Sequence, residues 1–180
     1  MGNLRFVALI LFPFVFSACG SGLATSYGEE KERARASSLA GVIDFADGSQ
    51  MNLGQQTDPV VLMFATYTCI SCKEEAFKMV EFFRSKGGLP ANAKIVTVLA
   101  GSGFSSAEKW KNKVCEDEST PCVTWPVGVN DDNSLFNTYC PDHLTPCVLT
   151  HNLSRAPTLI QRTGHVAIED LEKETGPWLY

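Results

Sequence analysis

The sequence predicts an α/β domain built on a mixed central sheet, and three observations lead to that prediction. Two continuous apolar runs, at 59–65 and 94–100, are typical of strands that are buried on both faces of a sheet. A predicted helix follows each run, which gives the β-α-β order of parallel strands. Hairpin patterns at both ends of the domain predict that antiparallel strands complete the sheet.

The N-terminal segment has the pattern of an export signal. Arg5 precedes an apolar run from Phe6 to Phe16, which is shorter than the about 20 residues that a transmembrane helix needs. The junction Phe16-Ser17-Ala18-Cys19-Gly20 resembles a bacterial lipobox, where the signal is cut before a cysteine that then carries lipid. We therefore expect residues 1–18 to be a lipoprotein signal peptide and Cys19 to be lipidated, with plain secretion as the alternative. The absence of Asp after Cys19 favours the outer membrane over the inner membrane.

Residues 19–40 are expected to form a polar tether that joins the lipid to a domain at 41–180. The segment is rich in Ser, Gly, Glu, Lys and Arg and has no apolar periodicity, although EEKERARASSLA is compatible with a short helix. The whole chain is mildly acidic, with 20 acidic against 15 basic residues. Because no stripe of Lys and Arg interleaves with aromatic residues, nucleic acid is not an expected partner.

The expected elements of the domain follow in order along the chain. Residues 42–45 and 51–53 form a hairpin with Asp47-Gly48 in its turn, and the first buried strand leads into a helix that stops at Gly87-Gly88. After the second buried strand we expect a helix at 105–114, a strand at 123–129 that Pro126 interrupts, a short helix at 134–139, a hairpin of strands at 158–161 and 165–168, and a closing helix at 169–174.

Cys69 and Cys72 stand where the first buried strand ends and the helix begins. Unpaired N–H groups and the positive end of the helix dipole favour the thiolate form of Cys69. Cys72 lies three residues later, on the same helical face and within bridging reach. The spacing therefore predicts an attacking thiol and a resolving thiol. Lys73 follows where a c-type haem attachment site has histidine, and we expect Lys73 and Glu74-Glu75 to form a solvated face.

Four further cysteines fall into a repeated sequence frame. Residues 115–123 read CEDESTPCV and residues 140–148 read CPDHLTPCV. Each frame would close a short loop around a Thr-Pro bend, which predicts two structural disulfides, Cys115–Cys122 and Cys140–Cys147. With Cys19 lipidated, six of the seven cysteines remain, an even number that suits an oxidising compartment.

The second frame also contains four possible zinc ligands, which are Cys140, His143, Cys147 and His151. In the first frame Glu118 stands where His143 does, and nothing matches His151. A shared frame without shared histidines favours a shared structural role, so we expect no metal. The remaining histidine, His165, is expected in a strand as a solvent-facing or packed residue.

The order of strand, C-x-x-C, helix, β-α-β and then X-Pro-strand-turn-strand resembles the thioredoxin family. The resemblance covers about residues 42–174. DFADGSQMNLG followed by DPVVLMFATYTCISC is similar to the extracytoplasmic thiol–disulfide oxidoreductases of the TlpA and ResA type. The resemblance implies a thioredoxin-like three-layer sandwich with a mixed central sheet and an N-terminal β-hairpin.

The resemblance also implies the residues that hold the substrate. Pro157 corresponds to a cis proline that packs beside the active cysteines, and Ala156 before it would offer backbone hydrogen bonds to an extended substrate. The segment at 140–156 is then a disulfide-bearing insertion beside the substrate face.

Three residues depart from the family pattern. Thr68 stands where family members usually carry Trp, and Ser71 stands where they often carry Pro. Met63 stands where many thioredoxins keep a buried acid, so the usual proton-transfer route for Cys72 is missing.

The expected function is thiol–disulfide exchange with proteins of the cell envelope through Cys69 and Cys72, with no cofactor. The expected partners are protein thiols or disulfides, an upstream redox partner, and the membrane through the lipid anchor. Two alternatives remain open: a thiol-based copper chaperone, and a non-catalytic thioredoxin-like binding module in which Cys69–Cys72 is a permanent disulfide. The residues between the two cysteines do not decide between a reductant, an oxidant and an isomerase.

Overall fold

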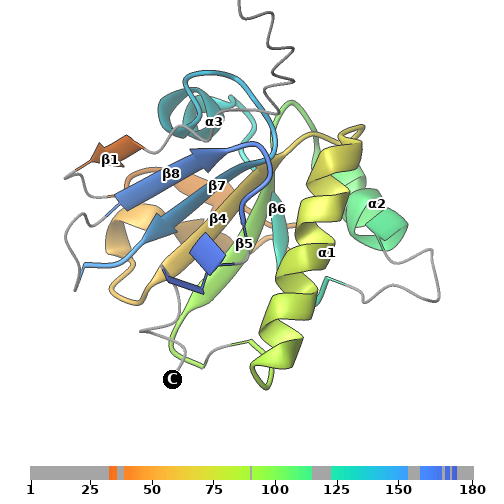
Figure 1. Cartoon of the computed structure of the whole chain (residues 1–180). Coiled ribbons are helices and arrows are strands. Elements are labelled where there is room, and N and C mark those ends of the chain that lie inside the picture. Colours follow the sequence, from red (N-terminus) through yellow and green to blue (C-terminus); the bar gives the residue numbers. More distant parts are fainter. Residues whose placement is uncertain are drawn as a thin grey trace, which may run out of the picture.

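Among the residues that the structure describes, eight strands form a mixed sheet at the centre of the protein (Figure 1). The computed structural model describes residues 33–35, 39–89, 91–114, 123–153, 159–167, 169–170 and 172–173. The strands are β1 (Arg33–Arg35), β2 (Val42–Asp44), β3 (Gln50–Asn52), β4 (Val60–Ala65), β5 (Lys94–Leu99), β6 (Val127–Val129), β7 (Cys147–His151) and β8 (Leu159–Thr163). They lie side by side in the order β1-β8-β7-β4-β5-β6-β2-β3.

The middle of the sheet is parallel and its two sides are antiparallel. β4 pairs in parallel with β5 from Val60↔Lys94 to Ala65↔Leu99, and β5 pairs in parallel with β6. β7 and β8 are antiparallel on one side, and the β2–β3 hairpin is antiparallel on the other. Every residue of β4 is buried, as its unbroken apolar run predicts. The expected mixed sheet with an N-terminal hairpin is confirmed.

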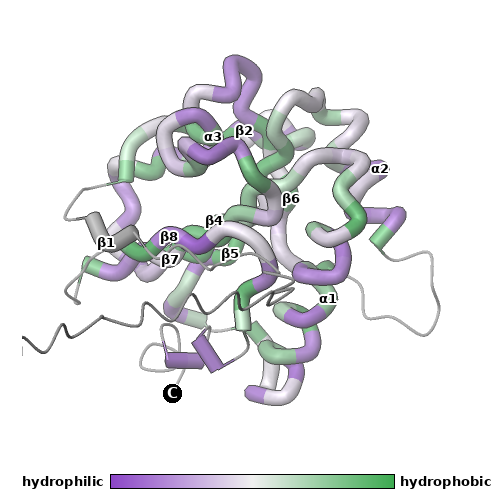
Figure 2. The backbone as a smooth tube through the Cα atoms, turned by 45° about the horizontal axis from the view of Figure 1, so that its top comes forward, coloured by the Kyte–Doolittle hydropathy of each residue, from purple (hydrophilic) through white to green (hydrophobic). Residues whose placement is uncertain are grey.

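Helices cover both faces of this sheet and make the three layers. α1 (Ile70–Ser85) and α2 (Phe104–Val114) pack on the face to which Met63 and Ala65 point. α3 (Ser134–Tyr139) packs on the opposite face together with the short 3-10 helix η1 (Leu53–Gln55), against Leu62 and Phe64. Figure 2 shows the corresponding pattern, with hydrophobic residues along the central strands and hydrophilic and hydrophobic residues alternating along α1.

The prediction of an insertion at 140–156 is wrong. Cys147–His151 is β7, which pairs with β4 through Phe64↔Cys147 and Val60↔His151 and is buried throughout. The expected hairpin at 158–161 and 165–168 is also wrong, because β8 pairs with β7 and the described residues 165–167 are not in a strand. The described part of this segment therefore contributes one of the central strands.

The folded part of the chain begins before residue 41, where the sequence placed the end of the tether. β1 pairs with β8 from Arg33↔Gln161 to Arg35↔Leu159, and Leu39 is buried in the α3-side core. Among the residues that the structure describes, no helix is both long enough and apolar enough to cross a bilayer. The expected signal peptide, Cys19, the pair Cys115 and Cys122, and Ala156 with Pro157 all lie outside the described residues.

Candidate functional site

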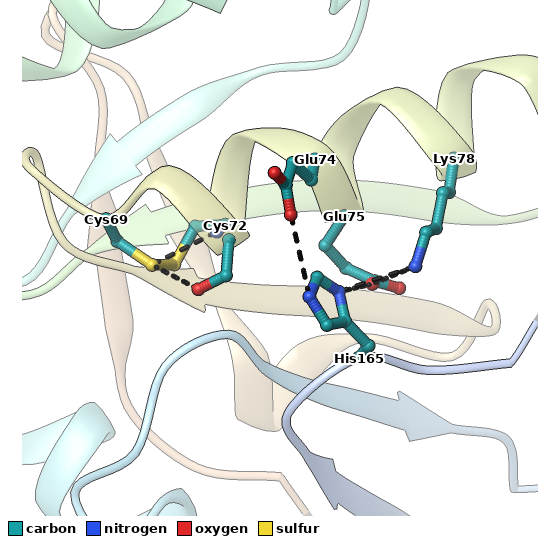
Figure 3. A network of polar contacts seen from close by, with 7 residues as sticks. Cys69, Cys72, Glu74, Glu75, Lys78 and His165 are labelled. Carbon is teal, nitrogen blue, oxygen red and sulfur yellow. Dashed lines mark hydrogen bonds and ion pairs between the residues drawn. A yellow bond between two sulfur atoms is a disulfide. The ribbon is translucent and has the colours of Figure 1, made fainter. Parts of the chain in front are cut away.

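The Cys69–Cys72 pair forms a disulfide at the start of α1, after the short turn that follows β4 (Figure 3). Cys69 is the N-cap residue of the helix, with extended backbone angles of φ −71° and ψ 107°, and Cys72 lies in the first turn. No acidic residue lies in that first turn. The N-terminus of a helix favours negative charge, so this placement suits a thiolate at residue 69 once the bond is reduced.

Within the described part of the chain, three hydrogen-bond donors converge on the sulfur of Cys69. The backbone N–H of Cys72 donates to Cys69 Sγ at 3.1 Å. The Ser71 hydroxyl lies 3.3 Å from the same sulfur, and the Thr145 hydroxyl donates to it at 3.6 Å. A disulfide sulfur carries no proton, so it can only accept in these contacts. The same donors would stabilise a sulfur that carries negative charge.

The two sulfur atoms of the pair differ in access. Cys72 is completely buried and packs in the core beneath α1, whereas Cys69 is only partly buried at its edge. Ile70, between them, is 73% exposed. A partner can therefore approach Cys69 but not Cys72, and the geometry distinguishes an outer from an inner sulfur.

Thr145 and Pro146 lie where the resemblance had led us to expect Ala156 and Pro157. The peptide bond between Thr145 and Pro146 is cis, Pro146 leads directly into β7, and the Thr145 side chain contacts Cys69. The positions of Ala156 and Pro157 lie outside the described residues. The structure thus brings the Thr145-Pro146 pair to Cys69, and its sequence signal was present in the T-P-C-V frame.

Glu75 is a buried carboxylate one helical turn beyond Cys72, which contradicts its expected place on a solvated face. Its side chain is 2% exposed. His165 Nδ1 lies 3.2 Å from Glu75 Oε2, and Lys78 Nζ lies 3.8 Å from the same oxygen. His165 also approaches the exposed Glu74 through Nε2, at 3.6 Å (Figure 3). The tautomer of His165 with a proton on Nδ1 donates to Glu75.

Burial dominates the electrostatics of Glu75. Loss of solvation raises the pKa of this carboxyl group above its ordinary value. The hydrogen bond to His165, the charge of Lys78 and the Val166 backbone N–H each oppose that rise. Spacing could have revealed Glu75, because it lies in the buried stripe that Cys72, Ala76 and Met79 define. A buried acid is thus present next to the pair, although Met63 occupies the position where thioredoxins usually keep one.

The alternative zinc ligands do not come together. Cys140 and Cys147 are joined in a disulfide. The ring of His143 packs against Phe136, and His151 is buried in β7, where loss of solvation lowers the pKa of its imidazole. Among the described residues there is no group of three or more His, Cys, Asp and Glu side chains that could hold a metal ion.

Comparisons with known proteins agree with the fold. No protein-family model and no curated protein sequence matches this chain. Solved structures do match it. The thioredoxin domain of the thiol-disulfide oxidoreductase BVU-2223 from Bacteroides vulgatus is 14% identical, with 82% of this chain and 99% of that chain covered and a TM-score of 0.59. A putative protein disulfide isomerase from Bacteroides thetaiotaomicron is 16% identical, with 84% and 94% covered and a TM-score of 0.63.

A third match is a secreted Mycobacterium tuberculosis disulfide oxidoreductase homologous to E. coli DsbE. It is 13% identical, with 76% of this chain and 95% of that chain covered and a TM-score of 0.56. The solved structures similar to this chain are thus thioredoxin-like proteins that include extracytoplasmic thiol–disulfide oxidoreductases. At these identities the likeness shows the fold, and the expected thioredoxin-like fold is confirmed.

Proposed function

We propose that this protein is a thiol–disulfide oxidoreductase that exchanges disulfides with other proteins through Cys69 and Cys72. The observation that carries the proposal is the environment of the Cys69 sulfur. It is partly accessible, lies at the N-terminus of α1, accepts three hydrogen bonds and is bonded to a fully buried Cys72. That environment stabilises a thiolate at the position that a partner can reach.

The exchange proceeds in two steps. In the reduced protein the Cys69 thiolate attacks a client disulfide, so that one client sulfur leaves as a thiolate and a mixed disulfide forms. Cys72 then loses its proton and attacks Cys69 Sγ, which releases the second client sulfur and restores the Cys69–Cys72 bond. Two electrons pass from the protein to the client. The oxidised protein runs the same steps in reverse, and an upstream redox partner resets the pair.

Glu75 is the candidate proton acceptor for Cys72. It follows Cys72 by one turn on the same face of α1 and is shielded from solvent. The raised pKa of its carboxyl group brings its proton affinity closer to that of a thiol, which suits proton exchange between the two groups. His165 and Lys78 would hold the carboxylate after it gives up a proton.

The loop before β7 is the candidate surface for binding a client segment. Thr145 lies beside Cys69, and the preceding Leu144 is 58% exposed. Ile70 lies between the two cysteines and is also exposed. A client segment that places its cysteine on Cys69 would therefore meet apolar side chains on both sides. We transfer to Thr145 and Pro146 the substrate-holding role that the resemblance implied for Ala156 and Pro157.

The N-terminal sequence supports a location for the protein in the cell. The lipobox-like junction before Cys19 supports export and lipid anchoring in the cell envelope, with the outer membrane favoured. One of the solved structures with the same fold is described as secreted. The clients would then be envelope proteins, whose cysteines meet an oxidising compartment.

The test is a redox titration of the full chain. The protein is equilibrated across a series of glutathione buffers, alkylated, and mapped by peptide mass spectrometry. We expect Cys69–Cys72 to titrate as one two-electron couple, whose potential assigns the direction of transfer. A Cys69–Cys72 bond that stays closed at every ratio would refute the proposal and favour the binding module. Stoichiometric retention of Cu(I) without exchange activity would favour the copper chaperone.

A further inference from the structure

We infer that the Cys140–Cys147 disulfide is a clamp that positions Thr145 against Cys69. The inference rests on the proposed role of Cys69 and adds a positioning element to it. The repeated sequence frame predicts only a structural role for this bond. The structure puts it on the loop that carries one of the three donors to the reactive sulfur.

The two ends of the clamp are anchored in the core. Cys140 follows the last residue of α3, and Cys147 is the first residue of β7. Both are completely buried, in the cluster that contains Phe64 and Tyr139. Cys147 pairs with Phe64 of β4 in the sheet, and β4 leads directly to Cys69. The bond therefore joins α3 to the strand next to the one that delivers the reactive cysteine.

The loop between these anchors is exposed. Asp142, His143 and Leu144 face solvent, and Thr145 then turns in to reach Cys69 Sγ at 3.6 Å. Within the loop, the His143 backbone N–H donates to the Cys140 carbonyl at 2.8 Å. Closing a short loop with a disulfide removes many of the conformations that the open loop would visit.

A contact of this length depends on accurate placement. At 3.6 Å the Thr145 hydroxyl is near the limit for a hydrogen bond to sulfur, so a small outward movement of the loop would end it. The clamp sulfurs lie on the α3 side of the sheet, and the reactive pair lies on the α1 side. Because the clamp is fully buried, it stays closed while Cys69–Cys72 opens and closes.

The test measures the thiolate of Cys69 directly. In full-length protein that carries Cys72→Ser, the rate of iodoacetamide labelling of Cys69 is followed by peptide mass spectrometry at a fixed, mildly acidic pH. Thr145→Val removes the donor and should slow labelling about three- to tenfold, the range of one hydrogen bond. Cys140→Ala/Cys147→Ala should slow it by the same factor, and adding Thr145→Val should slow it no further.

Two controls separate positioning from stability. Leu53→Ala truncates the same core cluster away from the loop, so it lowers stability while leaving Cys69 labelling unchanged. Insertion of two glycines between His143 and Leu144 keeps the disulfide but loosens the loop, and it should slow labelling as Thr145→Val does. This variant decides the question if the variant without the disulfide does not fold.

Two results would overturn the inference. One is unchanged labelling in the folded variant without the disulfide, or in the glycine insertion. The other is a combined variant whose loss equals the product of the separate losses, because the clamp would then act independently of Thr145. The proposed function fails by a different result, namely that the unaltered chain exchanges no disulfide, and labelling of Cys69 still measures the clamp in that case.

Discussion

Cys69–Cys72 and Cys140–Cys147 lie on opposite faces of one sheet, near the edge where β4 ends and β7 begins. The first bond is at the N-terminus of α1, with its outer sulfur partly exposed and surrounded by donors. The second has both sulfurs fully buried among apolar side chains. A partner protein can therefore reach one sulfur of the first disulfide but neither sulfur of the second.

The difference shows that surroundings rather than cysteine spacing assign a role to a disulfide. Attack on a disulfide requires access to a sulfur and a stabilised leaving thiolate, and only the Cys69 environment offers both. The buried bond instead limits the conformations of the loop that it closes.

Removal of the outer sulfur should abolish exchange. Cys69→Ser leaves no accessible nucleophile at the site, so the rate at which reduced protein cleaves a disulfide-bridged model peptide should fall to background. Cys72→Ser keeps the nucleophile but cannot resolve the intermediate, so a mixed disulfide should accumulate and be visible by intact mass. Retained exchange in Cys69→Ser would mean that Cys140–Cys147 or another pair is reactive, and the comparison would fail.

Removal of the buried bond should cost mainly stability. Cys140→Ala/Cys147→Ala opens a short loop, and we expect the free energy of unfolding to fall by about 2–3 kcal/mol. Urea unfolding of the variant and the unaltered chain, both without reductant, measures the loss. Disulfide exchange should be slowed but present. A variant that loses all exchange while it remains folded would show that the second disulfide takes part in the exchange reaction.

The adjacent glutamates provide a matched pair of variants. Glu75 is buried against His165, whereas the side chain of Glu74 is 59% exposed. Glu75→Gln should slow resolution of the mixed disulfide by about tenfold or more, because a positioned proton acceptor for Cys72 is lost. Glu74→Gln should leave the rate nearly unchanged. Rapid-quench analysis of the mixed disulfide measures both, and equal rates in the two variants would remove Glu75 from the mechanism.

Glu75 should also make stability depend on pH. Burial raises the pKa of its carboxyl group in the folded protein above the ordinary value of 4.5, so the folded state binds the proton more tightly than the unfolded chain. The charged form is the destabilising one. As pH falls from neutrality towards 4.5, the unaltered protein should therefore gain stability relative to Glu75→Gln. His165, Lys78 and Glu74 are present in both proteins, so the difference isolates Glu75. A constant difference across that range would contradict the assignment.

Much of the fold could be predicted because its signals are local. The unbroken apolar run of β4 and the stripe along α1 each identify an element without knowledge of the rest of the chain. β7 could not be found this way, because CVLTH carries polar residues and becomes a buried strand only by pairing with β4 and β8. β1 reads RAR and is likewise a strand by virtue of its pairing with β8.

The residues of the site divide in the same way, into those with a local sequence signal and those placed by strand pairing or burial. Cys69 and Cys72 were predicted from their spacing and their place after a strand. Thr145 was missed because the repeated T-P-C-V frame suggested a local loop in both copies, whereas contact with Cys69 depends on the β4–β7 pairing. Glu75 was missed because a charged residue on a helix usually faces solvent, whereas this one lies on the buried face of α1.

Ser71 is the second side-chain donor to Cys69, and its hydroxyl lies 3.3 Å from Cys69 Sγ. Ser71→Ala removes one of three donors and leaves the Cys72 N–H and Thr145 in place, so labelling of Cys69 in the Cys72→Ser background should slow about two- to fivefold. The serine is only partly buried, so water can replace part of the lost interaction. If Ser71→Ala slowed labelling more than Thr145→Val, the loop that the clamp holds would be the lesser support of the thiolate. The Cys140–Cys147 disulfide would then influence the Cys69 thiolate less than its position beside β4 implies.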